Sequence, residues 1–115
     1  MQDVLLDVRL PLVSKFGRLG RVVVAGPSME PAFMDGDWLL VVWGARARIS
    51  DAVVIEREFQ PGVFLVKRII KIEDGKYWVE GDNKVHSNDS RKWGSINGKE
   101  ILARVIFRIR KGASE

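Results

Sequence analysis

The sequence predicts one small domain built mainly of β-strands, arranged as a partly closed barrel or as two packed sheets. The chain has 115 residues, a length that fits a single domain. It is 46% hydrophobic and 30% charged, so it has enough apolar residues for a core. From residue 21 onward, short β-branched and aromatic runs alternate with Gly, Pro, Asn and Asp, which is typical of strands joined by turns.

The expected strands cover residues 21–25, 38–43, 52–56, 64–72, 76–80 and roughly 101–110. Gly-containing turns at 35–37, 61–62 and 74–75 separate them, and the last of these predicts a tight hairpin. Residues 81–98 are rich in Gly, Asn, Asp and Ser and are expected to form a long turn region. In the final strand, alternation should place Val105, Phe107 and Ile109 on one face and put Arg104, Arg108 and Arg110 on the other.

Residues 1–20 are expected to form an N-terminal segment ahead of the domain at 21–115. Val4, Leu5 and Val8 have helical spacing, but Pro11 limits any helix to a few turns. A membrane-spanning helix needs about 20 apolar residues, whereas uncharged runs such as 22–29 and 38–45 have only eight. We therefore expect no transmembrane segment, and peripheral contact with a membrane stays open.

The composition narrows the function classes. The chain has no cysteine and a single histidine, His86, which excludes thiolate chemistry and leaves too few ligands for an ordinary zinc site. We expect no metal and no cofactor. The net charge is +4, and residues 61–115 carry 12 basic and 7 acidic residues. A solvated basic surface explains this excess; the alternative is a β-barrel that binds nucleic acid, with Trp78 and Trp93 as stacking candidates.

Ser28 is the first candidate catalytic residue. It lies directly after an expected strand, between Pro27 and Pro31, which stiffen the segment, and Gly26 lets another backbone come close. A fixed, exposed hydroxyl of this kind suits a nucleophile. Taken alone, the same residues form an ordinary turn.

Lys67 is the second candidate. It lies in the apolar strand 64–72 next to Arg68, and alternation places the two side chains on opposite faces. If Lys67 faces the interior, burial disfavours its ammonium form and lowers its pKa, which suits a general base. Arginine cannot take this role because it stays protonated. The alternative is that both side chains extend to solvent.

Four motifs occur in a characteristic order: Ser-Met-x-Pro at 28–31, Gly-Asp with an apolar run at 36–41, Lys-Arg-x-Ile at 67–70, and Gly-Asp-Asn with Ser-x-Asp-Ser-Arg between 81 and 91. Over about residues 24–110 this order resembles the type I signal peptidase family of serine proteases. The resemblance implies that residues 21–115 form a protease catalytic domain with a Ser-Lys dyad.

The resemblance also implies a role for each matching residue. Ser28 would be the nucleophile, Lys67 the general base and Ser87 the hydroxyl that orients the lysine. Asp89 and Arg91 would form a structural ion pair, and Asp82 and Asn83 would support the site. The Ser28 N–H would contribute to the oxyanion hole. At Gly26, where some members offer a serine hydroxyl, a second donor would have to be backbone or water.

The chain differs from larger members of that family in two ways. It has no N-terminal membrane helices, and only 13 residues separate Lys67 from Gly81, so the extra β domain of those members is missing. A short form with this Gly-Asp-Trp-Leu-Leu-Val run is similar to the nickel-type superoxide dismutase maturation proteases. The predicted substrate is then the N-terminal extension of a nickel superoxide dismutase precursor.

We expect the precursor to bind as an extended peptide, added as a β-strand along an edge near residues 22–25. No nucleic acid is expected as a partner. The expected location is the cytoplasm, or a membrane surface if a native anchor is missing. The alternatives are a signal peptidase that acts on exported proteins and, from another class, the basic nucleic-acid-binding barrel. A self-cleaving repressor is disfavoured because Ala25-Gly26 lies too close to Ser28 to reach its own site.

Overall fold

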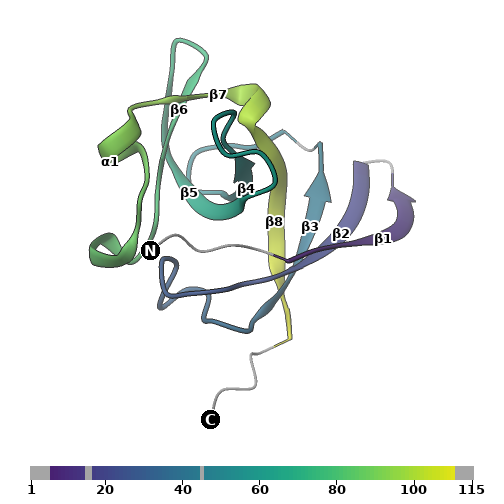
Figure 1. Cartoon of the computed structure of the whole chain (residues 1–115). Coiled ribbons are helices and arrows are strands. Elements are labelled where there is room, and N and C mark those ends of the chain that lie inside the picture. Colours follow the sequence, from purple (N-terminus) through teal and green to yellow (C-terminus); the bar gives the residue numbers. More distant parts are fainter. Residues whose placement is uncertain (1–5, 15–16, 45, 111–115) are drawn as a thin grey trace.

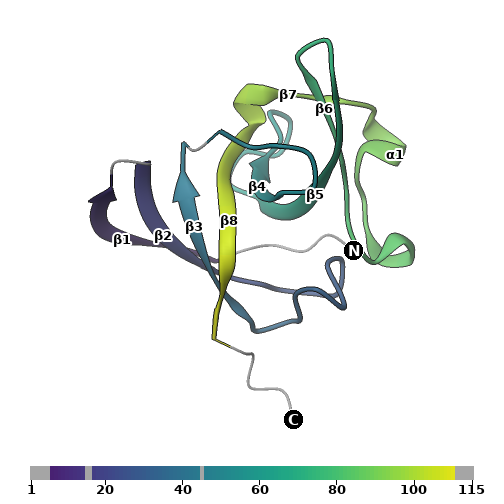
Figure 2. The same cartoon turned by 180° about the vertical axis from the view of Figure 1, so that it is seen from behind.

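The computed structural model describes residues 6–14, 17–44 and 46–110. Figure 1 and Figure 2 show an antiparallel, strongly curved sheet with a few short helical turns. The strands are β1 (Leu6–Ser14), β2 (Gly17–Val23), β3 (Trp38–Trp43), β4 (Ala52–Glu56), β5 (Phe64–Glu73), β6 (Lys76–Glu80), β7 (Ile96–Asn97) and β8 (Ile101–Arg110). The helical turns are η1 (Lys84–His86), α1 (Ser90–Trp93) and η2 (Gly98–Glu100).

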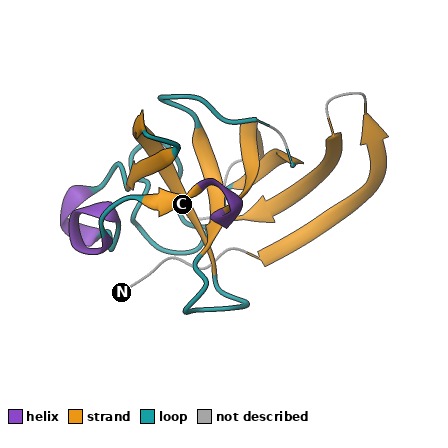
Figure 3. Cartoon of the chain, turned by 90° about the horizontal axis from the view of Figure 1, so that it is seen from above, coloured by secondary structure: helices purple, strands orange, loops and turns teal. Residues whose placement is uncertain are grey.

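The eight strands form one sheet in the order β1-β2-β3-β8-β4-β5-β6-β7. The last long strand, β8, therefore lies between β3 and β4 and joins the two halves of the chain. No pairing joins β1 to β7 in the described part of the chain, so the sheet stays open. Figure 3 shows the β1–β2 hairpin at the opposite end of the molecule from η1 and α1. The predicted mainly β, partly closed fold is confirmed, as a single sheet.

Most strand predictions agree with the structure. The strands at 38–43, 52–56, 76–80 and 101–110 have the predicted bounds, and β5 extends one residue further than expected. The strand expected at 21–25 instead begins at residue 17 and ends at 23. The dense turn chemistry between the strands explains this agreement, because Gly and Asp at the turns end one strand and begin the next.

The helical spacing noted near the N-terminus does not correspond to a helix in residues 6–14, which form a strand. From Leu6 the chain forms β1, which pairs with β2 through residues 6–9 and 13–14, and Val8 lies opposite Arg21; Val4 and Leu5 lie outside the described residues. Pro11 falls where the register between the two strands shifts. A proline has no N–H to donate to a strand partner, and it is tolerated at this irregular position because the regular pairing is interrupted there. The expected division at residues 20 and 21 thus falls inside β2.

The expected face alternation in β8 is also wrong. Val105 pairs with Val41, and Phe107 pairs with the next residue of β3, Leu40. Consecutive residues of a strand point to opposite faces, so Val105 and Phe107 do as well. A β-bulge at Ile106 causes this change. Phe107 is accordingly 54% exposed, and Ile109, at a second register shift, is 45% exposed.

Strand β4 and the first half of β5 are largely buried on both faces, whereas residues 70–73 of β5 are exposed. One face packs into a first core, made of Val22, Val24, Met29, Leu39, Val41, Trp43, Ala52, Val54, Val66 and Ala103. The other packs into a second core, made of Ala47, Val53, Ile55, Leu65, Ile69, Val79 and Ile96. Lys67 shares the strand face of Leu65 and Ile69 and pairs with Val53 of β4, so its side chain leaves the backbone on the side of the second core.

A close approach between β2 and the first core yields a stability prediction. A Cβ added to Gly20 would collide with Nε1 of the buried Trp43 indole. We expect Gly20→Ala to destabilise the protein by about 1–3 kcal/mol, because the core cannot yield without strain. Urea unfolding measures this, with Arg18→Ala on the exposed part of the same strand as control. In a Trp43→Leu background the loss should shrink, and full additivity of the two substitutions would contradict the proposed collision.

Candidate active site

Ser28 lies in the loop that joins β2 to β3. The loop is closed at its base by backbone hydrogen bonds from Val24 N to Asp37 O (2.9 Å) and from Gly36 N to Val24 O (2.7 Å). Met29 belongs to the first core, which anchors the loop from inside. Ser28 itself is 0% exposed, so the expectation of an exposed hydroxyl is wrong. The sequence placed the serine after a strand, and only packing decided its burial.

Lys67 is also 0% exposed, as expected for a lysine that faces the interior of this strand. Its Nζ donates a hydrogen bond of 2.9 Å to Ser87 Oγ. The predicted contact between Ser87 and the lysine is therefore present in the structure. Burial of an amine without an acceptor would be costly, and the Ser87 hydroxyl supplies that acceptor.

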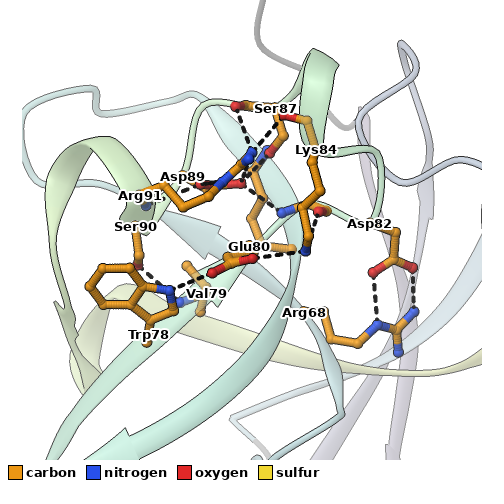
Figure 4. A network of polar contacts seen from close by, with 12 residues as sticks. Arg68, Trp78, Val79, Glu80, Asp82, Lys84, Ser87, Asp89, Ser90 and Arg91 are labelled. Atoms are coloured by element: carbon orange, nitrogen blue, oxygen red, sulfur yellow. Dashed lines mark hydrogen bonds and ion pairs between the residues drawn. The ribbon is translucent and has the colours of Figure 1, made fainter.

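Asp89 holds Ser87 in place. Its Oδ2 accepts hydrogen bonds from Ser87 Oγ (2.7 Å) and Gly81 N (2.9 Å), and its Oδ1 accepts one from Arg91 Nε (2.9 Å), as Figure 4 shows. Burial alone would raise the pKa of Asp89, but the hydrogen bonds from Arg91, Gly81 and Ser87 outweigh burial and lower its pKa to about 2. Arg91 also donates to the Lys84 carbonyl (2.7 Å). The predicted ion pair of Asp89 with Arg91 is thus formed.

The segment 81–83 contacts the loop that carries Ser28. Asn83 N donates to the Ser28 carbonyl oxygen (2.8 Å), and Asn83 Nδ2 donates to the Pro27 carbonyl oxygen (3.1 Å). A Cβ added to Gly81 would collide with Ser87 Oγ and would lie only 2.7 Å from the Ser28 carbonyl oxygen. Glycine at position 81 therefore lets Ser28 approach the hydroxyl that holds Lys67.

Arg68 ties the same segment to β5. Its side chain points away from that of Lys67, as alternation predicted, and its Nε and Nη2 donate to the two carboxylate oxygens of Asp82 (3.0 and 2.8 Å; Figure 4). A third bond runs from Nη1 to the Ser50 carbonyl (2.9 Å). The hydrogen bonds to Asp82 raise the pKa of Arg68. Asp82 N also donates to Met29 Sδ (3.4 Å), so the ion pair supports the base of the loop that carries Ser28.

Sequence reasoning assigned no role to Arg68 or Ser90. Ser90 Oγ accepts a hydrogen bond from Val79 N (2.9 Å), which ties α1 to β6. Both residues lie inside motifs that the sequence singled out, next to Lys67 and Asp89 respectively, and that adjacency was the available signal. The partners of both residues lie far from them in the chain, so the sequence alone does not predict these contacts.

The remaining expectations have mixed outcomes. The Gly26 N–H already donates a hydrogen bond to Asp35 Oδ1 (2.8 Å), and a place for Gly26 in an oxyanion hole stays a prediction.

His86 lies exposed in η1. Across residues 6–14, 17–44 and 46–110, no three acidic or histidine side chains gather in a way that could hold a metal ion. Within the same ranges, no helix is long and apolar enough to cross a membrane.

The lowered pKa of Asp89 gives a pH prediction for stability. A carboxylate whose pKa falls on folding adds stability above its unfolded pKa and loses it as the pH drops through the folded value. Asp89 should therefore add about 2 kcal/mol at neutral pH and lose it between about pH 4 and pH 2. We expect Asp89→Asn to be less stable than wild type at pH 7, with a difference that shrinks in this window. Urea unfolding against pH tests this.

Asp74→Asn is the matched control, because Asp74 lies exposed in the β5–β6 turn. Its stability should follow that of wild type at every pH. A constant difference between wild type and Asp89→Asn from pH 7 to pH 2 would contradict the assigned ionisation of Asp89.

The chain is similar in sequence to known peptidases. Residues 4–106 match the family described as Peptidase S24-like. The chain is 31% identical to mitochondrial inner membrane protease subunit 1 of Xenopus tropicalis, across 82% of this chain and 71% of that protein. It is 31% identical to mitochondrial inner membrane protease subunit 2 of Schizosaccharomyces pombe, across 72% of this chain but only 60% of that protein.

A shorter match is to another peptidase. A probable signal peptidase I-1 of Synechocystis is 38% identical over 39 residues, which are 34% of this chain and 20% of that protein. The match to the family covers almost all of the sheet and every residue of the site described above. The chain therefore belongs to the Peptidase S24-like family.

Proposed function

We propose that this protein is a serine endopeptidase in which Ser28 is the nucleophile and Lys67 the general base. The observation that carries the proposal is the contact made through Gly81. On one side of this glycine is Ser87, the acceptor of the buried Lys67 Nζ, and on the other is the backbone of Ser28. The backbone of a serine thus lies near the hydroxyl that holds a buried amine, and a serine paired with such an amine suits covalent catalysis.

In the proposed reaction, Ser28 Oγ attacks the scissile carbonyl carbon while neutral Lys67 takes its proton. The Ser28 N–H stabilises the resulting oxyanion. Collapse of the tetrahedral intermediate breaks the C–N bond, and the lysine returns the proton to the leaving amine. Water then attacks the acyl-enzyme with Lys67 again as base, which releases the acid and restores the serine. Ser87 keeps the amine aimed throughout.

The proposed substrate is an extended peptide. β1 and β3 pair with both sides of residues 22 and 23, which argues against docking at that part of the edge expected near residues 22–25. β5 offers a better edge: β4 pairs with residues 64–68, whereas β6 pairs only from residue 68 onward. Residues 64–66 thus lack a second partner strand in the described sheet, directly before Lys67. Because Ser28 is fully buried, substrate binding must also displace part of the surrounding loop.

The finer proposal is removal of an N-terminal extension from a nickel superoxide dismutase precursor in the cytoplasm. Its support is the resemblance of the short 67–81 segment and of the 36–41 run to such maturation proteases. The alternative is a signal peptidase acting on exported proteins, which the match to a probable signal peptidase I favours. Cleavage assays with the two precursors side by side distinguish these substrates. A nucleic-acid-binding role would be indifferent to the loss of Ser28.

The dyad is tested by substitution. We expect Ser28→Ala and Lys67→Met to reduce peptide cleavage by a factor of about 10⁴ or more while each folds, because either change removes a group that the covalent step needs. Lys67→Arg should be as inactive as Lys67→Met, since a guanidinium does not accept the proton. The measurement is cleavage of a precursor by each purified variant, with circular dichroism as folding control. Turnover near that of wild type in a folded Ser28→Ala protein would refute the assignment.

The dependence of cleavage on pH tests the base. A free lysine has a pKa of about 10.4, but burial favours the neutral amine, so kcat/KM should rise with pH through an apparent pKa well below that value. Arg91→Ala should raise the apparent pKa of this increase in kcat/KM. Asp89 would then lose its main counter-charge, and through Ser87 it would favour the ammonium form of Lys67. Arg48→Ala, an exposed arginine outside this network, is the control. If kcat/KM of wild type rose with an apparent pKa equal to that of free lysine, the proposed burial of the base would be contradicted.

A further inference from the structure

A cavity of about 620 Å³ adjoins the proposed catalytic residues. It begins at Pro27, the residue before Ser28, and includes Ser87, whose hydroxyl holds Lys67. The rest of its wall comes from η1 and α1 and the loop between them, which lie at one end of the molecule (Figure 3). A peptide that passes Ser28 on this side therefore runs into the cavity.

The wall of the cavity carries three permanent cations: Lys84, Arg91 and Lys92. Lys84 is 51% exposed and pairs with Glu80 (2.8 Å), which lies outside the lining. Lys92 is exposed and forms no ion pair with the described part of the chain. Among residues 6–14, 17–44 and 46–110, no carboxylate pairs with its ammonium.

The wall contains a single anion, Asp89, and it is hidden from the cavity. Asp89 is 0% exposed, and its two oxygens accept hydrogen bonds from Arg91, Ser87 and Gly81. The charge of Asp89 is thus offset inside the loop by Arg91, whose guanidinium pairs with it. A ligand in the cavity meets Lys84 and Lys92 without meeting an exposed carboxylate, so the field there is positive.

We propose that this cavity is a substrate subsite that accepts an acidic side chain of the cleaved peptide and that Lys92, assisted by Lys84, determines this preference. The inference rests on the proposed peptidase function. Pro27 places the subsite next to the scissile bond, on the side of η1 and α1. An Asp or Glu of the substrate would lie against Lys92, while its backbone stays within reach of Ser28.

The test is cleavage of a mixed library of extended peptides, with the cut sites identified by mass spectrometry. Wild type should enrich Asp and Glu at one position close to the scissile bond, on one side of it only. For a matched pair of peptides with Asp or Asn at that position, we expect about a two- to fivefold higher kcat/KM for Asp, the range of an exposed charge pair. The preference should fall toward unity in 1 M salt, which screens charges beyond about 3 Å.

Substitutions assign the preference to the cavity. Lys92→Gln should bring the ratio of Asp to Asn cleavage close to one, and Lys92→Glu should reverse it in favour of a Lys-containing peptide. Lys84→Gln should lower the ratio by less, because Glu80 already offsets its charge. Lys99→Gln is the matched control: this exposed lysine lines a separate cavity with Glu56, Arg57 and Glu100, and its loss should leave the ratio unchanged.

The outcomes separate this proposal from the peptidase proposal. Cleavage that needs Ser28 but shows equal ratios in wild type and Lys92→Gln overturns the subsite alone. No cleavage above that of Ser28→Ala overturns both. If Lys92→Gln instead weakens binding to vesicles of anionic phospholipid and leaves the peptide ratio unchanged, the cationic wall serves a membrane surface and the subsite is refuted.

Discussion

A lysine buried in a strand that is covered on both faces needs a hydrogen-bond acceptor, and the rest of this structure is built around that need. Lys67 has two apolar neighbours, Leu65 and Ile69, on its own face of β5. The acceptor is the Ser87 hydroxyl, at 2.9 Å. Ser87 can hold this position because its own proton goes to Asp89, and the order of these bonds orients the hydroxyl lone pair toward the amine. The polar chain thus runs from the sheet interior to the surface, where Arg91 ends it.

The turn region that contains Ser87 and Asp89 also holds the backbone around Ser28. The segment 81–83 contacts the loop that carries Ser28 through Asn83 and through the absence of a side chain at Gly81. Arg68, the neighbour of Lys67, braces it from the other face of β5 by its paired bonds to Asp82. One strand therefore supplies both the proposed base and the anchor of the segment that positions the nucleophile, so a shift of β5 would move both together.

Within residues 81–92, the negative charge of Asp89 lies in the interior and the positive charges lie at the surface. The carboxylate of Asp89 is buried, and its hydrogen bonds from Arg91, Gly81 and Ser87 lower its pKa and keep it ionised. The cations left over face outward, into the cavity beside Pro27. The same short segment, 81–92, thus supplies both the hydroxyl that accepts a hydrogen bond from Lys67 and the cations that line the cavity.

The sequence alone determined the strands whose turns are marked by Gly, Pro and Asp, because local backbone chemistry sets those bounds. Motifs in a characteristic order also indicated the candidate site residues Ser28, Lys67, Ser87 and Asp89, and the structure joins the last three by hydrogen bonds. The sequence could not determine β1, where pairing with β2 outweighed a helical apolar spacing, nor the bulge at Ile106 that turned Phe107 outward. The burial of Ser28, the brace of Arg68 on Asp82 and the cavity beside them depend on contacts between residues far apart in the chain. Such contacts exist only once the sheet has formed, and so only the tertiary structure decided them.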